Sequence, residues 1–399
     1  MSAGLPTLSS PLLPKSSPHA ASIARPYALS VNDAWTMTMP ARAELIEALP
    51  ASPGVVALFD AGQHCVLLAA SGDVRAFTGK RVAALTSEHD TSTLQIRCLL
   101  CPSMFEAERA YLQFARSLMP QTCRSVTDRW RCWFLRVDPQ RGRWAPASLE
   151  EAAADGSVFI GPMPEKHAPA RLGELLDDVF DLCRYPVELT KAPRGKPCAY
   201  YEMGRCLAPC AGLEAFGSFA ARFAQALDAL ESRAAVAAAI EAKMNTAASD
   251  MQFERAAELR AHYQRLSTRA GHSFEHIAPA PMWARLAVVP GNDGQAGLFA
   301  VRADGIAQIA RVARRATPSD LEPLLELIGH CLTRRVEPPF ERRGVEEMWL
   351  ACRRLFRKRR AEVYLVPEEA VDPSRLLSSV RREPIAEEES DSESRTEQP

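Results

Sequence analysis

Four cysteines lie close together between residues 183 and 210. The stretch reads CRYPVELTKAPRGKPCAYYEMGRCLAPC and holds four of the 11 cysteines in a chain of 399 residues. Thiolates are soft ligands, and four of them suit either a tetrahedral zinc ion or a [4Fe–4S] cluster. The spacing is not the CxxC pair of most zinc ribbons, which favours the cluster; the alternative is that some are simply buried thiols. The predicted metal ligands are Cys183, Cys198, Cys206 and Cys210.

The bulk composition is that of a soluble globular protein with two or three domains. Hydrophobic residues make up 47% of the chain and charged residues 24%, which are ordinary values. The net charge of −1 neither favours nor excludes nucleic acid, because a local basic surface matters more than the total. No apolar run is long enough for a membrane span, and no signal peptide is evident. We expect a cytoplasmic protein without membrane contact, in which clustered cysteines are ligands or catalytic thiols.

Periodicity and composition predict an α+β fold. Two apolar runs, GVVALFD and CVLLAA, are separated by the polar turn AGQH, which is typical of a β-hairpin. Helices are expected over 105–118 and 170–183, and strands over 282–312. The predicted segments are a disordered lead (1–42), a mixed α/β domain (43–135), a connecting segment with the four cysteines (136–212), a helical region (213–272), an α/β region (280–382) and a disordered acidic tail (383–399).

Two short helices are predicted within residues 240–266. Apolar or small side chains recur at helical spacing on both sides of a break near residues 249–252. Such a pair buries little surface by itself, so it must pack on its own protein or on a partner.

A basic run, CRRLFRKRR, ends the last predicted helix. Cations at this position either contact phosphates or simply favour the helix C-terminus, and the sequence leaves both interpretations open. The predicted nucleic-acid contacts of the first interpretation are Arg353, Arg354, Arg357, Lys358, Arg359 and Arg360.

The cysteine stretch resembles a known family. The strings GRCLAPCAG, CRYP and KPCAYYEM, preceded by FIGPMPEKHAPARLGELLDDVFDLC, look like the cysteine-rich region of UvrC, the endonuclease subunit of bacterial nucleotide excision repair. The family cysteines associated with an iron–sulfur cluster correspond to the four predicted ligands. The resemblance therefore implies a [4Fe–4S] cluster, with zinc as the alternative.

The predicted helix pair is similar to the UVR motif of the same family. Its core runs M…A…FE.AA.LR, which this chain matches between residues 244 and 260. In UvrC the motif docks on the matching motif of UvrB, so the resemblance implies a UvrB-type partner with Phe253 as the apolar anchor. The implied partner-binding residues are Met244, Phe253, Glu254, Ala257 and Arg260.

The resemblance also implies a GIY-YIG nuclease domain over residues 43–135. LPASPGVVALFD and FEAERAYLQFARSLMP are similar to the family's hairpin and metal-binding helix. Such a domain uses two tyrosines, an arginine and a glutamate that holds a divalent metal. These groups activate water and stabilise the phosphate charge that develops.

The chemistry of that nuclease is mostly substituted in this chain. Val56 and Leu68 stand at the tyrosine positions and Gln113 at the glutamate, while Arg75 retains the arginine. Aliphatic side chains transfer no proton, and an amide binds a hard dication weakly. We expect an inactive nuclease fold without a divalent metal; Glu106 and Glu108 are alternative ligands with no motif behind them.

The sequence therefore predicts a UvrC-like accessory protein of nucleotide excision repair. We expect it to bind UvrB or a UvrB-like protein, with or without DNA, and not to cut. It also lacks recognisable RNase H-like and helix-hairpin-helix segments. One alternative is an active GIY-YIG-type DNA endonuclease with a rearranged site around Arg75. Another is a redox- or iron-responsive structural protein.

Overall fold

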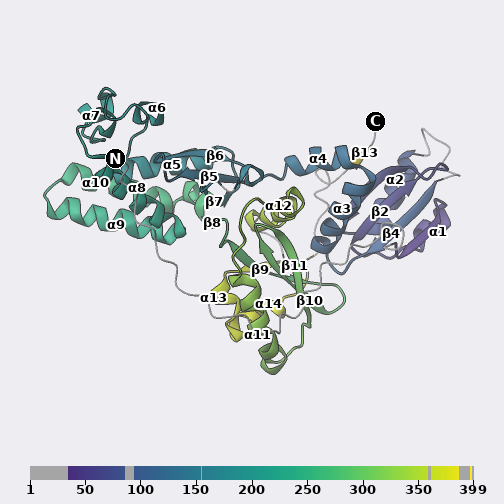
Figure 1. The fold of residues 1–399 in the computed structure, drawn as a ribbon. Helices are drawn as coiled ribbons and strands as arrows, with labels where there is room; N and C mark the ends of the chain where they lie inside the picture. Colours follow the sequence, from purple (N-terminus) through teal and green to yellow (C-terminus); the bar gives the residue numbers. More distant parts are fainter. Residues whose placement is uncertain (1–34, 86–93, 154, 358–360, 386–395, 398–399) are drawn as a thin grey trace, which may run out of the picture.

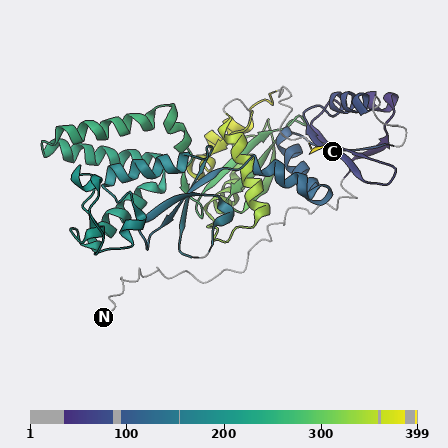
Figure 2. The ribbon, with the colours of Figure 1, turned by 90° about the horizontal axis from the view of Figure 1, so that it is seen from above.

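Three antiparallel sheets with their helices organise the chain (Figures 1 and 2). The structure, a computed structural model, describes residues 35–85, 94–153, 155–357, 361–385 and 396–397. The fold is α+β, as predicted. Among the helices described, none has both the length and the hydrophobicity of a membrane span.

The N-terminal domain is a sheet of order β1-β4-β2-β3-β13 with helices on both faces. The predicted hairpin is confirmed as β2 and β3, with Val56 paired to Ala69. Helix α3 begins after Ser103, whose hydroxyl accepts a hydrogen bond from the Glu106 amide at 3.2 Å. The strands are β1 (Met37–Pro40), β2 (Gly54–Phe59), β3 (Cys65–Ser71), β4 (Gln95–Leu100) and β13 (Thr396–Glu397), and the helices are α1 (Ala43–Glu47), α2 (Val74–Leu85), α3 (Met104–Leu118) and α4 (Pro120–Asp128).

Two predicted disordered ends contain strands where the structure describes them. Strand β1 lies inside the predicted lead and pairs with β4, with Met37 opposite Cys98. Strand β13 lies inside the predicted acidic tail and pairs with β3, with Thr396 opposite Leu68. Edge strands offer unpaired backbone groups, and these segments satisfy them. The rest of the predicted lead before residue 35 lies outside the described residues, as do 386–395 and 398–399 of the tail.

The middle sheet has the order β6-β5-β7-β8 and extends across the predicted boundary at residue 135, which falls inside β5. After β7 the chain runs through α5, the cysteine stretch and three long helices before returning as β8. There Ala278 pairs with Gly161 of β7. The elements are β5 (Trp133–Asp138), β6 (Arg143–Ala147), β7 (Val158–Met163), β8 (Ala278–Pro279), α5 (Ala168–Phe180), α8 (Phe216–Asp228), α9 (Arg233–Ser249) and α10 (Phe253–Ser267).

The C-terminal domain is a sheet of order β11-β10-β9-β12. Its two faces are buried in different clusters, one under α11, α13 and α14 and the other under α12. The predicted β segment is confirmed, and so is the predicted last helix, which is α12. The elements are β9 (Ala284–Pro290), β10 (Gln295–Arg302), β11 (Gly305–Ala313), β12 (Val363–Leu365), α11 (Pro318–Thr333), α12 (Arg342–Phe356), α13 (Pro367–Ala370) and α14 (Pro373–Val380).

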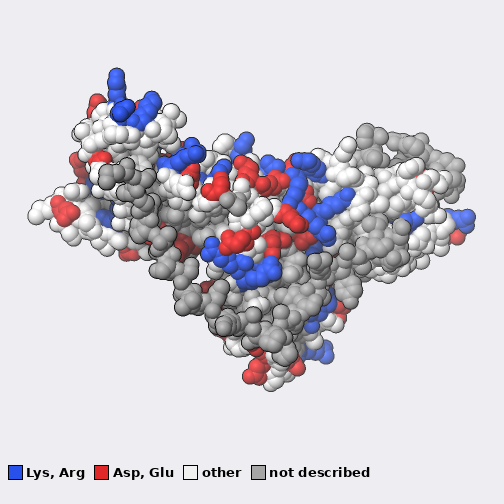
Figure 3. Space-filling model, viewed as in Figure 1, with Lys and Arg blue, Asp and Glu red and all other residues white. Residues whose placement is uncertain are grey.

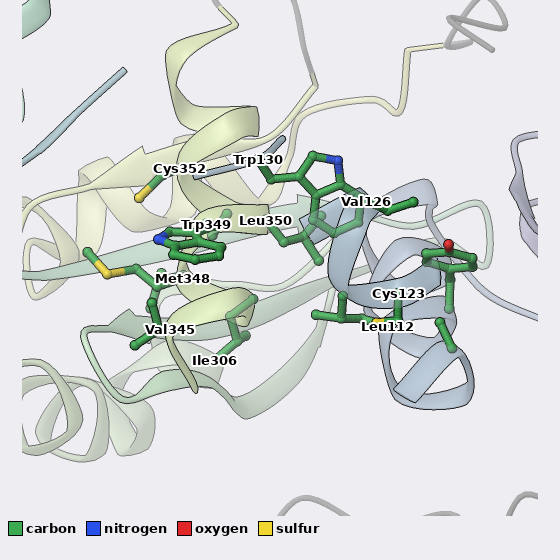
Figure 4. Close-up of a cluster of buried hydrophobic side chains, with 14 of the residues drawn as sticks. Leu112, Cys123, Val126, Trp130, Ile306, Val345, Met348, Trp349, Leu350 and Cys352 are labelled. Atoms are coloured by element: carbon green, nitrogen blue, oxygen red, sulfur yellow. The ribbon is translucent and has the colours of Figure 1, made fainter. Parts of the chain in front are cut away.

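Helix α12 joins the N-terminal and C-terminal domains through one continuous core. Figure 4 shows Trp349 and Leu350 of α12 in the same cluster as Leu112 of α3, Val126 of α4 and Ile306 of β11. Burying a large apolar side chain contributes about 1.5–3 kcal/mol. The two domains therefore share apolar burial and are not independent units.

A buried ion network crosses the same seam. Glu108 of α3 accepts hydrogen bonds from Arg353 and Arg354 of α12, both at 2.5 Å, and Arg354 also pairs with Glu362. The Arg354 side chain is 0% exposed. Losing one member of such a network leaves a buried charge uncompensated, which costs about 3–5 kcal/mol.

Helix α5 carries a carboxyl group in an apolar environment. Asp177 is buried, and burial raises its pKa to about 8 even though the nearby Arg184 opposes the shift. The folded chain therefore keeps Asp177 protonated at pH values where the unfolded chain ionises it. Stability from this group is complete below pH ~4, the unfolded pKa, and is lost as the pH rises towards 8.

We expect Asp177→Asn to stabilise the protein at pH 8 and to have little effect at pH 4, because the amide cannot ionise. The gain should be a few kcal/mol, since each pKa unit corresponds to about 1.4 kcal/mol. Denaturant unfolding at pH 4, 6 and 8 measures it. Parallel pH profiles for both proteins would contradict this assignment.

Candidate functional site

The four cysteines lie in a loop-rich segment, residues 181–215, which we call the cysteine module (Figure 1). Helix α5 ends at Asp181, whose positive φ of 51° turns the chain into the module. Cys183 follows this turn, Cys198 precedes a short helix, and Cys210 lies in a 3-10 turn. The short elements are α6 (Pro186–Leu189), α7 (Ala199–Glu202) and η3 (Pro209–Ala211).

Backbone contacts fold the module onto itself. The Gly195 amide donates a hydrogen bond to the Cys210 carbonyl at 2.8 Å. A side chain at Gly195 would place its Cβ only 2.8 Å from that oxygen, so glycine is required for the approach. Ala208 has a φ of 51° and bends the chain between Cys206 and Cys210.

The thiols interact with one another. Cys183, Cys206 and Cys210 are buried and Cys198 is half-buried. Cys183 donates a hydrogen bond to Cys206, which lowers the pKa of the Cys206 thiol and raises that of Cys183. Burial raises the pKa of Cys210, and the neighbouring Cys206 and Cys198 raise it further. The structure thus brings all four predicted ligands within electrostatic range.

The chemistry of the donor set fits a thiolate-bound zinc ion or iron–sulfur cluster. In the described part of the chain, however, no three Cys, His, Asp or Glu side chains are placed to hold one ion. The Cys210 thiol lies 3.6 Å from the Lys196 carbonyl and the Cys183 thiol 3.6 Å from the Tyr185 carbonyl. The module gathers the donors without presenting a complete ligand set.

Helices α9 and α10 form the predicted antiparallel pair, which we call the hairpin (residues 233–267). They are joined at residues 250–252, where Met251 has a φ of 58°. One face of the hairpin, including Ile240, Leu259 and Leu266, is buried in the core of the middle sheet. The hairpin therefore packs on its own protein along one side.

The other face and the tip of the hairpin are exposed. Phe253 is 68% exposed and Met251 76%. Three of the remaining predicted partner residues are also exposed, namely Glu254, Ala257 and Arg260. The fourth, Met244, is half-buried and packs against the core.

Polar contacts that the sequence analysis missed fix the hairpin to α5 and to the cysteine module. Arg255 of α10 donates hydrogen bonds to the Asp178 carbonyl at 2.5 Å and to the Asp181 carboxylate at 2.8 Å. Arg205, next to Cys206, pairs with Glu258 of α10. No sequence pattern signals these pairs, because their partners are distant in the chain.

The predicted nuclease positions do not form one site. Val56 and Leu68 are both 0% exposed, but they face opposite sides of the sheet. Val56 packs with Phe77 of α2, whereas Leu68 packs with Leu112 of α3. The positions that resemble the catalytic tyrosines therefore contribute to two separate cores.

The two remaining nuclease positions are also apart. Arg75 is on α2, where its guanidinium donates to the Leu49 carbonyl. Gln113 is half-buried on α3, on the opposite face, and lines a cleft of about 790 Å³ between α3, β11 and α12. The alternative ligands are engaged elsewhere, since Glu106 pairs with Arg311 at 2.5 Å and Glu108 belongs to the ion network.

The basic run at the end of α12 is not a continuous surface. Figure 3 shows positive and negative side chains intermixed over the central part of the molecule. Arg353 and Arg354, predicted as nucleic-acid contacts, are instead held in the seam by Glu108. The structure contradicts the prediction for Arg354, because a fully buried, paired guanidinium cannot reach phosphate, whereas Arg353 is half-buried. Arg357 is exposed, and Lys358, Arg359 and Arg360 lie outside the described residues.

Comparison with known proteins agrees with this geometry. Residues 132–229 match the model of the UvrC/Cho excinuclease middle domain, and residues 235–261 match the UvrB/uvrC motif. The first match covers strands β5, β6 and β7 of the middle sheet and the cysteine module, and the second covers most of the hairpin. Within residues 132–261 the chain therefore resembles the UvrC family.

Curated relatives match about half of the chain. The UvrABC system protein C of Thermus thermophilus is 34% identical over 195 residues, which is 46% of this chain and 32% of that protein. The protein of the same name from Desulforudis audaxviator is 30% identical over 230 residues, or 55% and 36% of the two chains. The chain thus spans about a third of the length of these relatives. No solved structure matches it.

Proposed function

We propose that this protein acts in nucleotide excision repair as a UvrC-like accessory factor that binds UvrB, or a UvrB-like protein, through its hairpin. The observation that carries the proposal is the exposed apolar tip, Met251 and Phe253, on a segment that matches the UvrB/uvrC motif. An exposed phenylalanine on a rigid helix is typical of an interface anchor.

The proposal divides the hairpin into two functional faces. Leu259 and Leu266 hold it on the middle sheet, while Phe253, Ala257 and Arg260 follow one another at helical spacing on the outer side of α10. A partner can therefore bind without displacing the contacts within the chain. Rigid attachment lowers the entropy cost of binding.

We further propose that the N-terminal domain is a nuclease-like scaffold without cutting activity. Val56 and Leu68 are core side chains, and Gln113 faces a cleft lined by Asp304 and Glu347 rather than Arg75. A base, a cation and a carboxylate must converge on one phosphate for metal-assisted cleavage. Their separation by the sheet supports a structural role.

For the cysteine module we propose a [4Fe–4S] cluster bound by Cys183, Cys198, Cys206 and Cys210, with zinc as the alternative. The support is the mutual proximity of the four thiols on loops that contact one another. A bound cluster would cross-link these loops, which contain only short helices and turns. As cluster ligands these cysteines would stabilise the fold of the module and would not take part in a reaction.

The partner proposal predicts that Phe253→Asp weakens the affinity for purified UvrB by about 30-fold or more, because an anchor is worth about 2 kcal/mol or more. Leu327→Asp is the control, since Leu327 is 39% exposed on α11, far from the hairpin in the chain. Calorimetric titration measures both. No binding by the unaltered protein would overturn the proposal.

The scaffold proposal predicts no nicking of supercoiled or ultraviolet-damaged plasmid with Mg²⁺ or Mn²⁺. Arg75→Ala should leave this background unchanged. A nicked product that is formed by the unaltered protein and lost in Arg75→Ala would instead favour the endonuclease interpretation.

The cofactor proposal predicts about four irons and four sulfides per chain after anaerobic purification. Cys206→Ala should lose them, whereas Cys331→Ala, a buried thiol on α11, should retain them. Elemental analysis and visible absorption give the readout. One zinc per chain would establish the alternative, and neither metal would refute both.

A further inference from the structure

The cysteine module exposes an unusual amount of apolar surface. Fourteen large hydrophobic side chains are exposed among the described residues, and half of them lie in the 32 positions from residue 185 to 216. Concentrated exposure of this kind marks interaction sites in soluble proteins. Six of these side chains belong to the module and the seventh begins α8; they are Tyr185, Val187, Tyr201, Met203, Leu207 and Leu213, and Phe216.

These side chains point outward, whereas neighbouring residues of the same segment occupy the buried positions. Leu207 is 48% exposed between Cys206 and Ala208, which are 3% and 1% exposed. On α6, Val187 is 71% exposed while Leu189 is 4%. The core of the module is thus complete without the exposed side chains. Their exposure is therefore not the result of incomplete packing.

The same surface has a small excess of positive charge, because three of its cations, Arg184, Lys191 and Arg205, pair with carboxylates. Between residues 183 and 214 the chain has five Lys or Arg and three Glu. Arg194 and Lys196 are exposed on the turn that Gly195 fixes against Cys210. Figure 3 shows positive side chains over α6 and α7. A partner surface that matches this one has apolar side chains at its centre and carboxylates at its edge.

The module lies against the hairpin. Arg205 pairs with Glu258 of α10, and Arg184 donates to the Arg205 carbonyl at 3.2 Å. Figures 1 and 2 both place α6 and α7 beside the hairpin. A protein seated on the exposed side of α10 therefore approaches the module.

We infer that the cysteine module and the hairpin tip form one composite docking surface for a single acidic partner protein. The inference rests on the proposed function, since the partner is the protein that binds the hairpin. A specific interface buries about 800 Å² on each side. Met251 and Phe253 supply only part of that area, because even a fully buried aromatic side chain contributes about 150–250 Å². The apolar side chains of the module supply the remainder.

The test is titration of purified UvrB with variants in the module. Met203→Asp combined with Leu213→Asp should weaken binding about tenfold or more, because each residue is more than half exposed and is lost from the apolar centre. Arg194→Glu combined with Lys196→Glu should weaken binding and reduce its salt dependence. Val187→Ser is a milder variant that removes an exposed side chain with little risk to folding.

Three controls assign the outcome. Thermal unfolding and metal content must match those of the unaltered protein, and Leu327→Asp must bind normally. Normal binding by all the module variants while Phe253→Asp is defective would overturn the inference and leave the proposed function standing. No binding by the unaltered chain would remove both.

Two other occupants give different results and would also overturn the inference. If the module variants change sedimentation from dimer to monomer without altering UvrB affinity, the surface joins two copies of this chain. If the charge-reversal variant loses affinity only for a fluorescent DNA duplex, the surface binds phosphate.

Discussion

The ion network between α3 and α12 is the constraint on which the arrangement of the molecule depends. Glu108 pairs with both Arg353 and Arg354 of α12, and Arg354 also pairs with Glu362. The side chain of Arg354 is 0% exposed, so its guanidinium depends on these carboxylates and not on water. Two domains distant in sequence are therefore held in one orientation by charge and by the apolar cluster around Trp349. The contacts of α12 therefore determine how the two domains are placed relative to each other.

This seam is consistent with the scaffold role proposed for the N-terminal domain. Helix α3, which carries the position of the family's metal ligand, has its acidic side chains committed to arginines of the C-terminal domain. The sheet behind it is filled by aliphatic residues at Val56 and Leu68. Glu106 and Glu108 thus stabilise contacts between the two domains. The proposed function uses the other end of the molecule, the cysteine module and the hairpin.

Local sequence patterns predicted most helices and strands, but they did not predict contacts between residues that are distant in the chain. The β2–β3 hairpin and helices α3, α5, α11 and α12 follow from alternation and helical periodicity. Helix α2 was missed because its apolar side chains lack a clear period. Strand β1 was missed because a four-residue edge strand gains its stability from β4. The basic run of α12 looked like surface because the partner of Arg353 lies 245 residues away. At the site, the cysteines and Phe253 were evident as residue types, whereas the ion pair between Arg205 and Glu258 was not.

The return of the chain to the middle sheet has a mechanical consequence. Everything from α5 to α10 is inserted between β7 and β8, which pair with each other where Gly161 meets Ala278. Both ends of this excursion are thus clamped at one point. Phe134 of β5 and Phe159 of β7 pack in the same buried cluster as Trp349 of α12. The sheet that clamps the excursion is therefore coupled to the seam through one continuous core, and a load on the hairpin passes into it.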